Sequence, residues 1–198
     1  MVEDVRYSHF TRLKFDRPEP AVLRVKLSNG KMNSADKAMH AELAEIWSII
    51  DKDPTVNAVI LTGDGNTFSA GGDFKMIEEM VVDFEERARA WKESRDIVYG
   101  IINCSKPIVS AMRGVAVGAG LVCGLLADIT IASRDCRMVD GHTRLGVAAG
   151  DHAAIIWPLL CGMAKSKMYL LLCDPVSGED AERMGLISMC VDDADLDA

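Results

Sequence analysis

Two stretches of small residues place backbone N–H groups where they could bind a carbonyl oxygen. Ala70-Gly71-Gly72 and Gly118-Ala119-Gly120 each follow a strand-like run and precede a helical one. The first N–H groups of a helix have no partner inside it. Two such donors that converge on one oxygen make an oxyanion hole, and small residues let a carbonyl approach the backbone to about 3 Å. The alternative is that these glycines only permit tight packing of strand against helix.

A histidine and an aspartate could supply proton transfer. The unperturbed pKa of an imidazole is near 6.5, so His142 is a competent general base at neutral pH, and Asp151 follows nine residues later. A carboxylate beside an imidazole fixes its tautomer and stabilises its protonated form. The alternatives are a surface histidine in a turn and an aspartate that caps the helix starting near His152. His152 is a further candidate base, whereas His9 and His40 are expected in solvent.

The elements that must position these residues alternate between extended and helical patterns. Helices are predicted over residues 35–51, capped by Ser34 or Asn33, and over roughly residues 76–103. This order predicts an α/β fold in one domain, residues 1–198, with strands joined through helices. The predicted strands are residues 21–27, 55–62, 106–112 and 128–133.

Other polar or bulky residues are expected in structural roles. Asp73 can cap the helix after its loop, and Asp128 can anchor the start of a strand. Met76, Met80 and Trp91 could line an acyl pocket, but such residues at helical spacing are more often core. The six cysteines form no CxxC pair, and most lie in apolar runs where thiols behave as small hydrophobes.

Composition excludes several classes of function. The net charge of −8 disfavours a nucleic-acid surface, and no basic run contradicts this. No window reaches about 18 uncharged apolar residues, so no membrane partner is expected. The acidic N-terminus MVEDVRYSHF is unlike a signal peptide. We therefore expect a soluble, cytoplasmic protein.

Five segments, taken in order, resemble the successive signatures of the crotonase (enoyl-CoA hydratase/isomerase) superfamily: SNGKMNS, FSAGGDFKM, KPIVSAMRGVAVGAGL, LADITIAS and VSGEDAERMGLIS. They cover roughly residues 20–191, which is far more specific than one motif. The resemblance implies a crotonase-like superhelix of ββα repeats, with two roughly perpendicular sheets wrapped by helices. It also implies a homotrimer or a dimer of trimers. The chain stops soon after GLISMCV, so residues 1–198 are expected to form a core domain lacking the C-terminal helices of relatives.

The same resemblance assigns roles to individual residues. Ala70 and Ala119 would donate the two oxyanion-hole N–H groups to an acyl-CoA thioester. No cofactor is implied beyond the coenzyme A carried by the substrate. The stretches that would border the acyl-CoA contain Lys31, Met32, Ser34, Gly71, Gly72, Asp73, Phe74 and Gly118.

The sequence departs from the hydratases at their two catalytic glutamates, which are replaced by Val122 and His142. Valine cannot exchange a proton, so water activation by two carboxylates cannot operate here. His142 with Asp151 also resembles a β-diketone hydrolase branch of the 6-oxocamphor hydrolase type. There, a histidine and an aspartate at like spacing activate water for carbon–carbon cleavage. That branch has a second histidine near the oxyanion loop, where this sequence has Ala119 or its neighbours.

Three functions follow as hypotheses. The first is a CoA-thioester enzyme of the hydratase or isomerase kind, with His142 moving the proton. The second is a hydrolase that cleaves a β-diketone or β-keto thioester by retro-Claisen chemistry, using His142 with Asp151. The third is an acyl-CoA binder that has kept the fold and lost the chemistry. The residues do not specify the acyl group, because that depends on the shape of the pocket.

Overall fold

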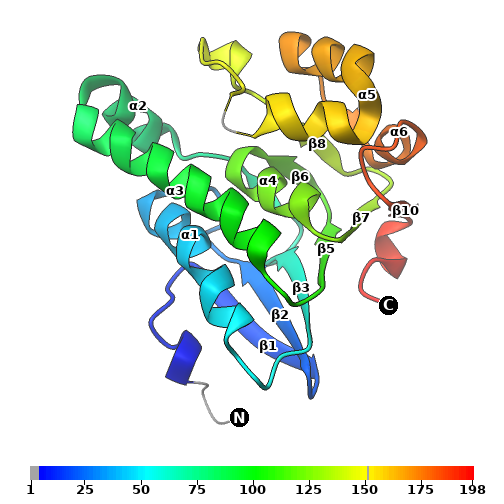
Figure 1. The fold of residues 1–198 in the computed structure, drawn as a ribbon. Coiled ribbons are helices and arrows are strands. Elements are labelled where there is room, and N and C mark those ends of the chain that lie inside the picture. The colour runs from blue at the N-terminus through cyan, green and yellow to red at the C-terminus, as the bar shows by residue number, and fades with distance from the viewer. Residues whose placement is uncertain (1–4, 151) are drawn as a thin grey trace.

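The apolar runs form a six-stranded sheet in the computed structural model, which describes residues 5–150 and 152–198 (Figure 1). The strand order is β1-β2-β3-β5-β7-β10, with β1 antiparallel to β2 and the other neighbours parallel. The predicted strands are confirmed as β2, β3, β5 and β7, with ends that differ by up to three residues. The six strands are β1 (Leu13–Glu19), β2 (Val22–Leu27), β3 (Ala58–Gly63), β5 (Ile108–Met112), β7 (Ile129–Ser133) and β10 (Met189–Val191).

A second, smaller sheet lies beside the first and consists of β4 (Ser69–Ala70), β6 (Val115–Val117), β8 (Arg137–Val139) and β9 (Val176–Ser177). β6 lies between β4 and β8 and is parallel to both, whereas β9 is antiparallel to β8. The chain is therefore an α/β fold with two sheets, as the sequence predicted.

Helices α1 (Lys37–Asp51) and α3 (Phe84–Asn103) run side by side (Figure 1). The apolar face of α1 is buried and includes Trp47. Gly100 on α3 allows the close approach, because a Cβ atom there would lie 3.1 Å from Trp47 Cδ1. The predicted cap residues of α1 are wrong. Asp36 is the cap, and its carboxylate accepts from the Met39 amide, because the helix starts two residues later than expected.

The long helix predicted over residues 76–103 is two helices, α2 (Phe74–Val82) and α3. Asp83 between them has an extended backbone (φ −114°, ψ 121°), and its carboxylate accepts from the Glu85 and Glu86 amides. An aspartate that can cap a new helix competes with continuation of the old one. The predicted cap at Asp73 is confirmed, because its side chain accepts from the Lys75 and Met76 amides.

The remaining helices are α4 (Gly118–Leu126), α5 (Ala153–Leu172) and α6 (Gly178–Arg183), with short 3-10 helices at η1 (Val5–Tyr7), η2 (Thr143–Leu145) and η3 (Asp193–Asp195). The predicted anchoring role of Asp128 is confirmed, because its carboxylate accepts from the Ile108 amide at 2.7 Å and joins the start of β7 to that of β5.

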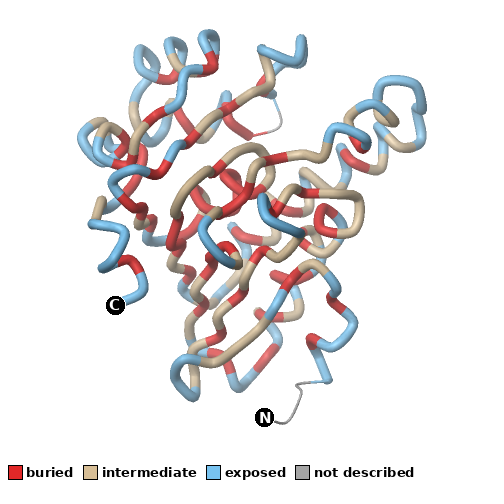
Figure 2. Tube along the Cα trace, turned by 180° about the vertical axis from the view of Figure 1, so that it is seen from behind, coloured by how far each residue is buried: buried red, intermediate tan, exposed pale blue. Residues whose placement is uncertain are grey.

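α5 is apolar and largely exposed (Figure 2). By length and composition alone it could cross a membrane, although the sequence led us to expect no such span. Gly162, with φ 77° and ψ 161°, breaks the helical backbone at its middle. Each half is shorter than the about 20 residues of a spanning helix, and α5 packs on η2 and α4.

Candidate active site

Three chain segments leave the small sheet at one edge. Ala70 at the end of β4 pairs with Val117 at the end of β6, and Val117 pairs with Val139 at the end of β8. These parallel strands therefore end in a single row. Neighbouring strands are about 4.8 Å apart, so the segments that follow them are adjacent in space. Ligand sites commonly form at this carboxyl edge of parallel strands.

The first two of these segments are in close backbone contact. A Cβ atom on Gly118 would lie 3.1 Å from Gly71 Cα and 3.4 Å from Gly72 N. Gly71 (φ 87°) and Gly118 (φ 54°) both have a left-handed backbone that favours glycine. A side chain at either position would separate the segments. The prediction that the two glycine-bearing stretches come together is confirmed.

The expectation that Ala70 donates an oxyanion-hole N–H group is wrong. The Ala70 amide donates to the carbonyl oxygen of Met32 at 2.9 Å, so it is already used inside the fold. This hydrogen bond joins β4 to the loop between β2 and α1. Ala70 therefore holds the first glycine segment in place and does not face a ligand.

The Gly72 amide is not used in the way that the Ala70 amide is. Gly72 forms a parallel bridge with Ala35, and both hydrogen bonds of the bridge belong to Ala35: its amide donates to Gly71 O at 2.8 Å, and its carbonyl accepts from Asp73 N at 3.0 Å. The Gly72 amide consequently points to the other side. Within residues 5–150 and 152–198, no protein acceptor for it is found.

Ala119 stands opposite, as the second residue of α4. Its amide belongs to the first turn, where an α-helix offers no internal acceptor. Gly120 on the same turn fits against β4, because a Cβ atom there would lie 2.4 Å from the Ser69 Cβ. The helix start is thereby pressed onto the first segment. The amides of Gly72 and Ala119 are thus two donors on adjoining backbones that could share one oxygen.

The third segment carries His142, which is hydrogen-bonded to Asp140. His142 Nδ1 lies 2.9 Å from Asp140 Oδ2 and 3.1 Å from Oδ1, and the His142 amide donates to Oδ1 at 3.3 Å. The imidazole is 23% exposed, whereas the Asp140 carboxylate is 2% exposed. The predicted partner Asp151 lies outside the described residues. Sequence reasoning missed Asp140, although the spacing Asp-Gly-His is typical of an Asx turn.

His152 lies close to this pair but is buried. Its ring centroid is 6.0 Å from that of His142, in an edge-on arrangement, and the residue is 4% exposed. It occupies the position before α5, where its backbone (φ −154°, ψ −41°) is neither helical nor extended. Of the two histidines, His142 is the more accessible, because its side chain is 23% exposed.

The loop that was expected to border an acyl-CoA braces the first glycine segment. The side-chain amide of buried Asn33 donates to the backbone carbonyls of Asp64 and Thr67. The backbone carbonyl of Asn33 accepts from Ser69 Oγ at 2.8 Å. Lys31 and Met32 are exposed beside it, Ser34 is half-buried, and Phe74 is 72% exposed at the start of α2. Lys31, Met32 and Ser34 lie on the loop between β2 and α1, and Phe74 lies at the start of α2. Their exposed surface is accessible to a ligand.

Known proteins resemble this chain over most of its length. A family model described as enoyl-CoA hydratase/isomerase matches residues 17–198. The chain belongs to the enoyl-CoA hydratase/isomerase family. It is 32% identical over 171 residues to 1,2-epoxyphenylacetyl-CoA isomerase of Escherichia coli K12, covering 84% of this chain and 64% of that relative's length.

Solved structures of the hydratase/isomerase family superimpose closely. An enoyl-CoA hydratase/isomerase from Mycobacterium paratuberculosis has a TM-score of 0.88 and 33% identity, covering 92% of this chain and 74% of that one. An enoyl-CoA hydratase from Bacillus anthracis has a TM-score of 0.86 and 26% identity, covering 94% and 72%. The fold expected from the sequence is therefore confirmed as that of the crotonase superfamily.

Val122 of this hydratase/isomerase-family chain lies in the same helix as the second donor. It is one helical turn beyond Ala119 and is 4% exposed, so it presents a buried isopropyl group beside the helix start. No proton can be exchanged there. The titratable pair that follows β8 at this edge of the sheet is His142 with Asp140.

Proposed function

We propose that this chain processes acyl-CoA thioesters by stabilising an enolate oxygen with the amides of Gly72 and Ala119. The observation that supports this most is the register row of Ala70, Val117 and Val139, which brings both donors and His142 to one edge. Each such donor typically accounts for about 3 kcal/mol of barrier lowering. Gly72 replaces Ala70 in this role, and Ala119 keeps the role that the sequence suggested.

His142 is the proposed acid and base. The Asp140 carboxylate can only accept, so Nδ1 carries a hydrogen, and in the neutral ring Nε2 is the basic nitrogen. His142 Nε2 takes a proton from the carbon next to the thioester carbonyl, and the electron pair moves onto the carbonyl oxygen. Return of the same proton two carbons further along moves the double bond. These two proton transfers together are an isomerisation of the double bond, for which one base suffices.

The direct test is an assay with a β,γ-unsaturated acyl-CoA and with crotonyl-CoA. Isomerisation creates conjugated enoyl absorbance from the first ester, and hydration removes it from the second. His142→Gln should lower the isomerisation rate by about 100-fold or more, the usual contribution of a general base. His9→Gln is the matched control, because the His9 side chain is 51% exposed and remote in sequence. Equal rates in His142→Gln and wild type would reject the role of His142.

A second candidate is hydrolytic cleavage of a β-diketone or a β-keto thioester. The pairing of His142 with a buried carboxylate favours it, because such a pair can deprotonate water as readily as carbon. Water adds to one carbonyl, the carbon–carbon bond breaks, and the departing enolate is held by the two amides. Ring opening of a cyclic β-diketone, without turnover of either enoyl ester, would favour this reaction.

Binding without turnover is the third candidate. It predicts that the wild type binds CoA esters without turning them over, so that His142→Gln causes no loss of turnover. In all three cases the coenzyme A of a CoA-ester ligand would border Lys31, Met32, Ser34 and Phe74. We also propose that the chain assembles as a homotrimer or a dimer of trimers. Sedimentation velocity of the purified chain measures that assembly.

A further inference from the structure

A cavity of about 350 Å³ opens between α3 and α5, next to the proposed acid–base pair. Its walls are mostly apolar and aromatic, and His152 lines it at the end nearest His142. A volume of this size accommodates a small organic group. The apolar lining includes Trp91, Tyr99 and Ile102 from α3 and Ile155 and Ile156 from α5.

Ser94 places a hydroxyl group in this apolar wall. Its Oγ lies 3.4 Å from His40 Nε2, and His40 Nδ1 lies 2.6 Å from Glu93 Oε2. Ser94, His40 and Glu93 thus form a relay of hydrogen bonds. The His40 side chain is 7% exposed and that of Glu93 is 15% exposed, so the relay is largely shielded from water. The expectation that His40 lies in solvent is wrong, because α1 turns it toward α3.

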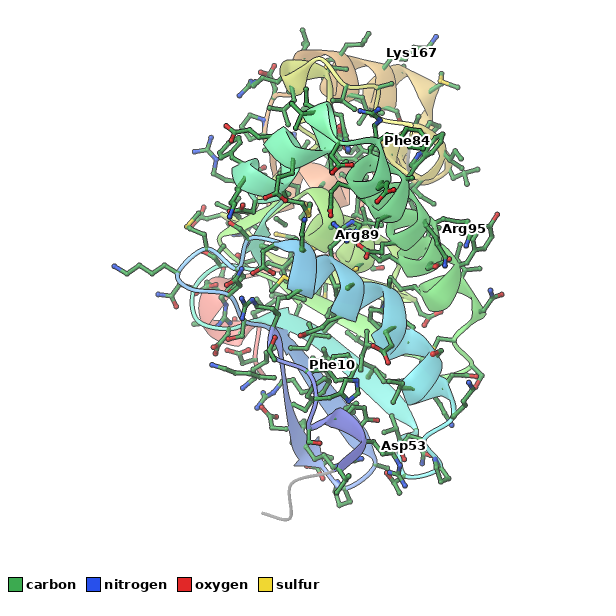
Figure 3. All side chains as sticks on the ribbon, turned by 90° about the vertical axis from the view of Figure 1, so that its left-hand side faces the viewer. Phe10, Asp53, Phe84, Arg89, Arg95 and Lys167 are labelled. Carbon is green, nitrogen blue, oxygen red and sulfur yellow. The ribbon has the colours of Figure 1, made fainter. Side chains whose placement is uncertain are left out.

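Further charges hold the relay in position. Arg89, one turn before Glu93, donates to both of its carboxylate oxygens at 2.6 Å, and its label in Figure 3 lies where α3 meets α1. Arg89 also contacts Glu86, which is paired with Lys37 of α1 at 2.8 Å. Burial raises the pKa of Glu93, but hydrogen bonds from His40 and Arg89 outweigh it, so its pKa lies below the usual value. Glu93 is therefore a carboxylate that accepts from His40.

This arrangement fixes what Ser94 can offer to a ligand. With Nδ1 against Glu93, His40 contacts the Ser94 hydroxyl through Nε2 and holds Oγ at the cavity wall. A hydroxyl has one hydrogen to donate and two lone pairs to accept, so Oγ keeps hydrogen-bonding capacity for a ligand hydroxyl besides its contact with His40. Arg95, the charged residue at the cavity, is paired with Asp96 at 2.8 Å, which weakens its attraction for an anionic ligand.

We propose that this cavity receives the distal end of the acyl group and that Ser94, positioned by His40, selects an acyl group bearing a hydroxyl over its unsubstituted parent. This inference rests on the acyl-CoA function proposed above. A site that can hydrogen-bond a substrate hydroxyl disfavours an analogue that cannot make this bond to the Ser94 hydroxyl. The ligand class is a CoA thioester whose acyl group has an apolar or aromatic body and a hydroxyl away from the thioester.

Binding of saturated CoA esters tests this without requiring turnover. Isothermal titration calorimetry on the full chain would compare hexanoyl-CoA with its ω-hydroxy analogue, and dihydrocinnamoyl-CoA with its para-hydroxy analogue. We expect the hydroxy ester of at least one pair to bind about tenfold more tightly than its parent, the size of one good hydrogen bond. In Ser94→Ala this ratio should fall to about one. Ser94→Thr, which keeps a hydroxyl, should retain part of it.

Ser48→Ala is the matched control, because it removes an exposed hydroxyl from α1 that donates to the Glu45 carbonyl one turn before it. It should keep the wild-type ratio. Equal affinities within both pairs in the wild type, or a preference that survives in Ser94→Ala, would overturn the inference while leaving the acyl-CoA function intact. Failure of every ester to bind would reject both.

Discussion

His142 Nδ1 lies 2.9 Å from Asp140 Oδ2, so the imidazole and the carboxylate that orients it come from a single turn after β8. The carboxylate is buried and the ring is partly exposed. The Nδ1 edge of the imidazole is thereby bound to the protein through Asp140. Asp140 and His142 are two positions apart in the chain, so the turn itself brings the two side chains together.

The first prediction follows from this pair. Asp140→Asn keeps the shape of the side chain, but its amide can donate to Nδ1 and so place the imidazole hydrogen on Nε2. The basic nitrogen would then face the protein, and we expect turnover to fall by about 100-fold or more. Steady-state rates measure the loss. Circular dichroism of the variant checks that the turn has not unfolded, and an unchanged rate would contradict the orienting role.

The second prediction concerns contact between the glycine segments. Gly118→Ala places a Cβ atom 3.1 Å from Gly71 Cα, at a residue with φ 54°. The segments must separate by a few tenths of an ångström, which should misplace both amides and lower turnover by about tenfold or more.

Gly65→Ala is the matched control for that prediction. Gly65 also has a positive φ of 80°, but a Cβ atom there meets nothing within 4 Å. Both variants carry the backbone strain of a non-glycine residue, about 1 kcal/mol of stability. Only Gly118→Ala should lose activity beyond that strain. Equal activity in the two variants would show that the close contact is unimportant.

Much of the fold could be predicted because its strands carry simple patterns. β2 alternates half-buried and buried residues, and this alternation is visible in the sequence. β1 was not predicted, because it carries the charges Lys14, Asp16 and Arg17 and a proline, Pro18, on an edge of the sheet. Its polar residues are used at that edge, where Arg24 of β2 donates to Asp16 at 2.8 Å.

The site was predicted less completely, for reasons of backbone geometry. Both glycine segments could be located in the sequence. Whether Ala70 or Gly72 has an amide available for a ligand depends on the fold, in which the Ala70 amide donates to the Met32 carbonyl. The left-handed turn at Gly71 reverses the local direction of the amides. Likewise, His40 looks like any polar helix residue until α3 packs over it and supplies Glu93.

The third prediction concerns the thiols. Burial raises the pKa of both Cys123 and Cys136 to about 12. The thiolate is the reactive form, so at pH near 8 these two cysteines should resist alkylation by iodoacetamide in the folded protein. Peptide mapping would measure the modified fraction, with urea-unfolded protein as the positive control. Rapid labelling of Cys123 under native conditions would contradict its burial in α4.

The last prediction links Asp53 to stability in acid. Its side chain is fully buried and accepts hydrogen bonds from the Thr55 amide and hydroxyl and from the Tyr7 hydroxyl at 2.8 Å. Burial alone raises the pKa of Asp53, but these hydrogen bonds and the charge of Arg6 outweigh it and lower the pKa to about 2. In the unfolded chain the pKa of an aspartate is near 3.9.

Because the folded pKa is the lower one, this carboxylate stabilises the fold above about pH 4, and the contribution is lost as the pH falls toward about 2. Its size is on the order of 2.5 kcal/mol, from a difference of about two pKa units. Urea unfolding of wild type and Asp53→Asn should therefore differ most near neutral pH, and the gap should narrow in acid. Asp174→Asn, which changes an exposed carboxylate, should show no such narrowing. A gap between wild type and Asp53→Asn that stays constant down to about pH 2 would mean that Asp53 titrates alike in the folded and unfolded chains.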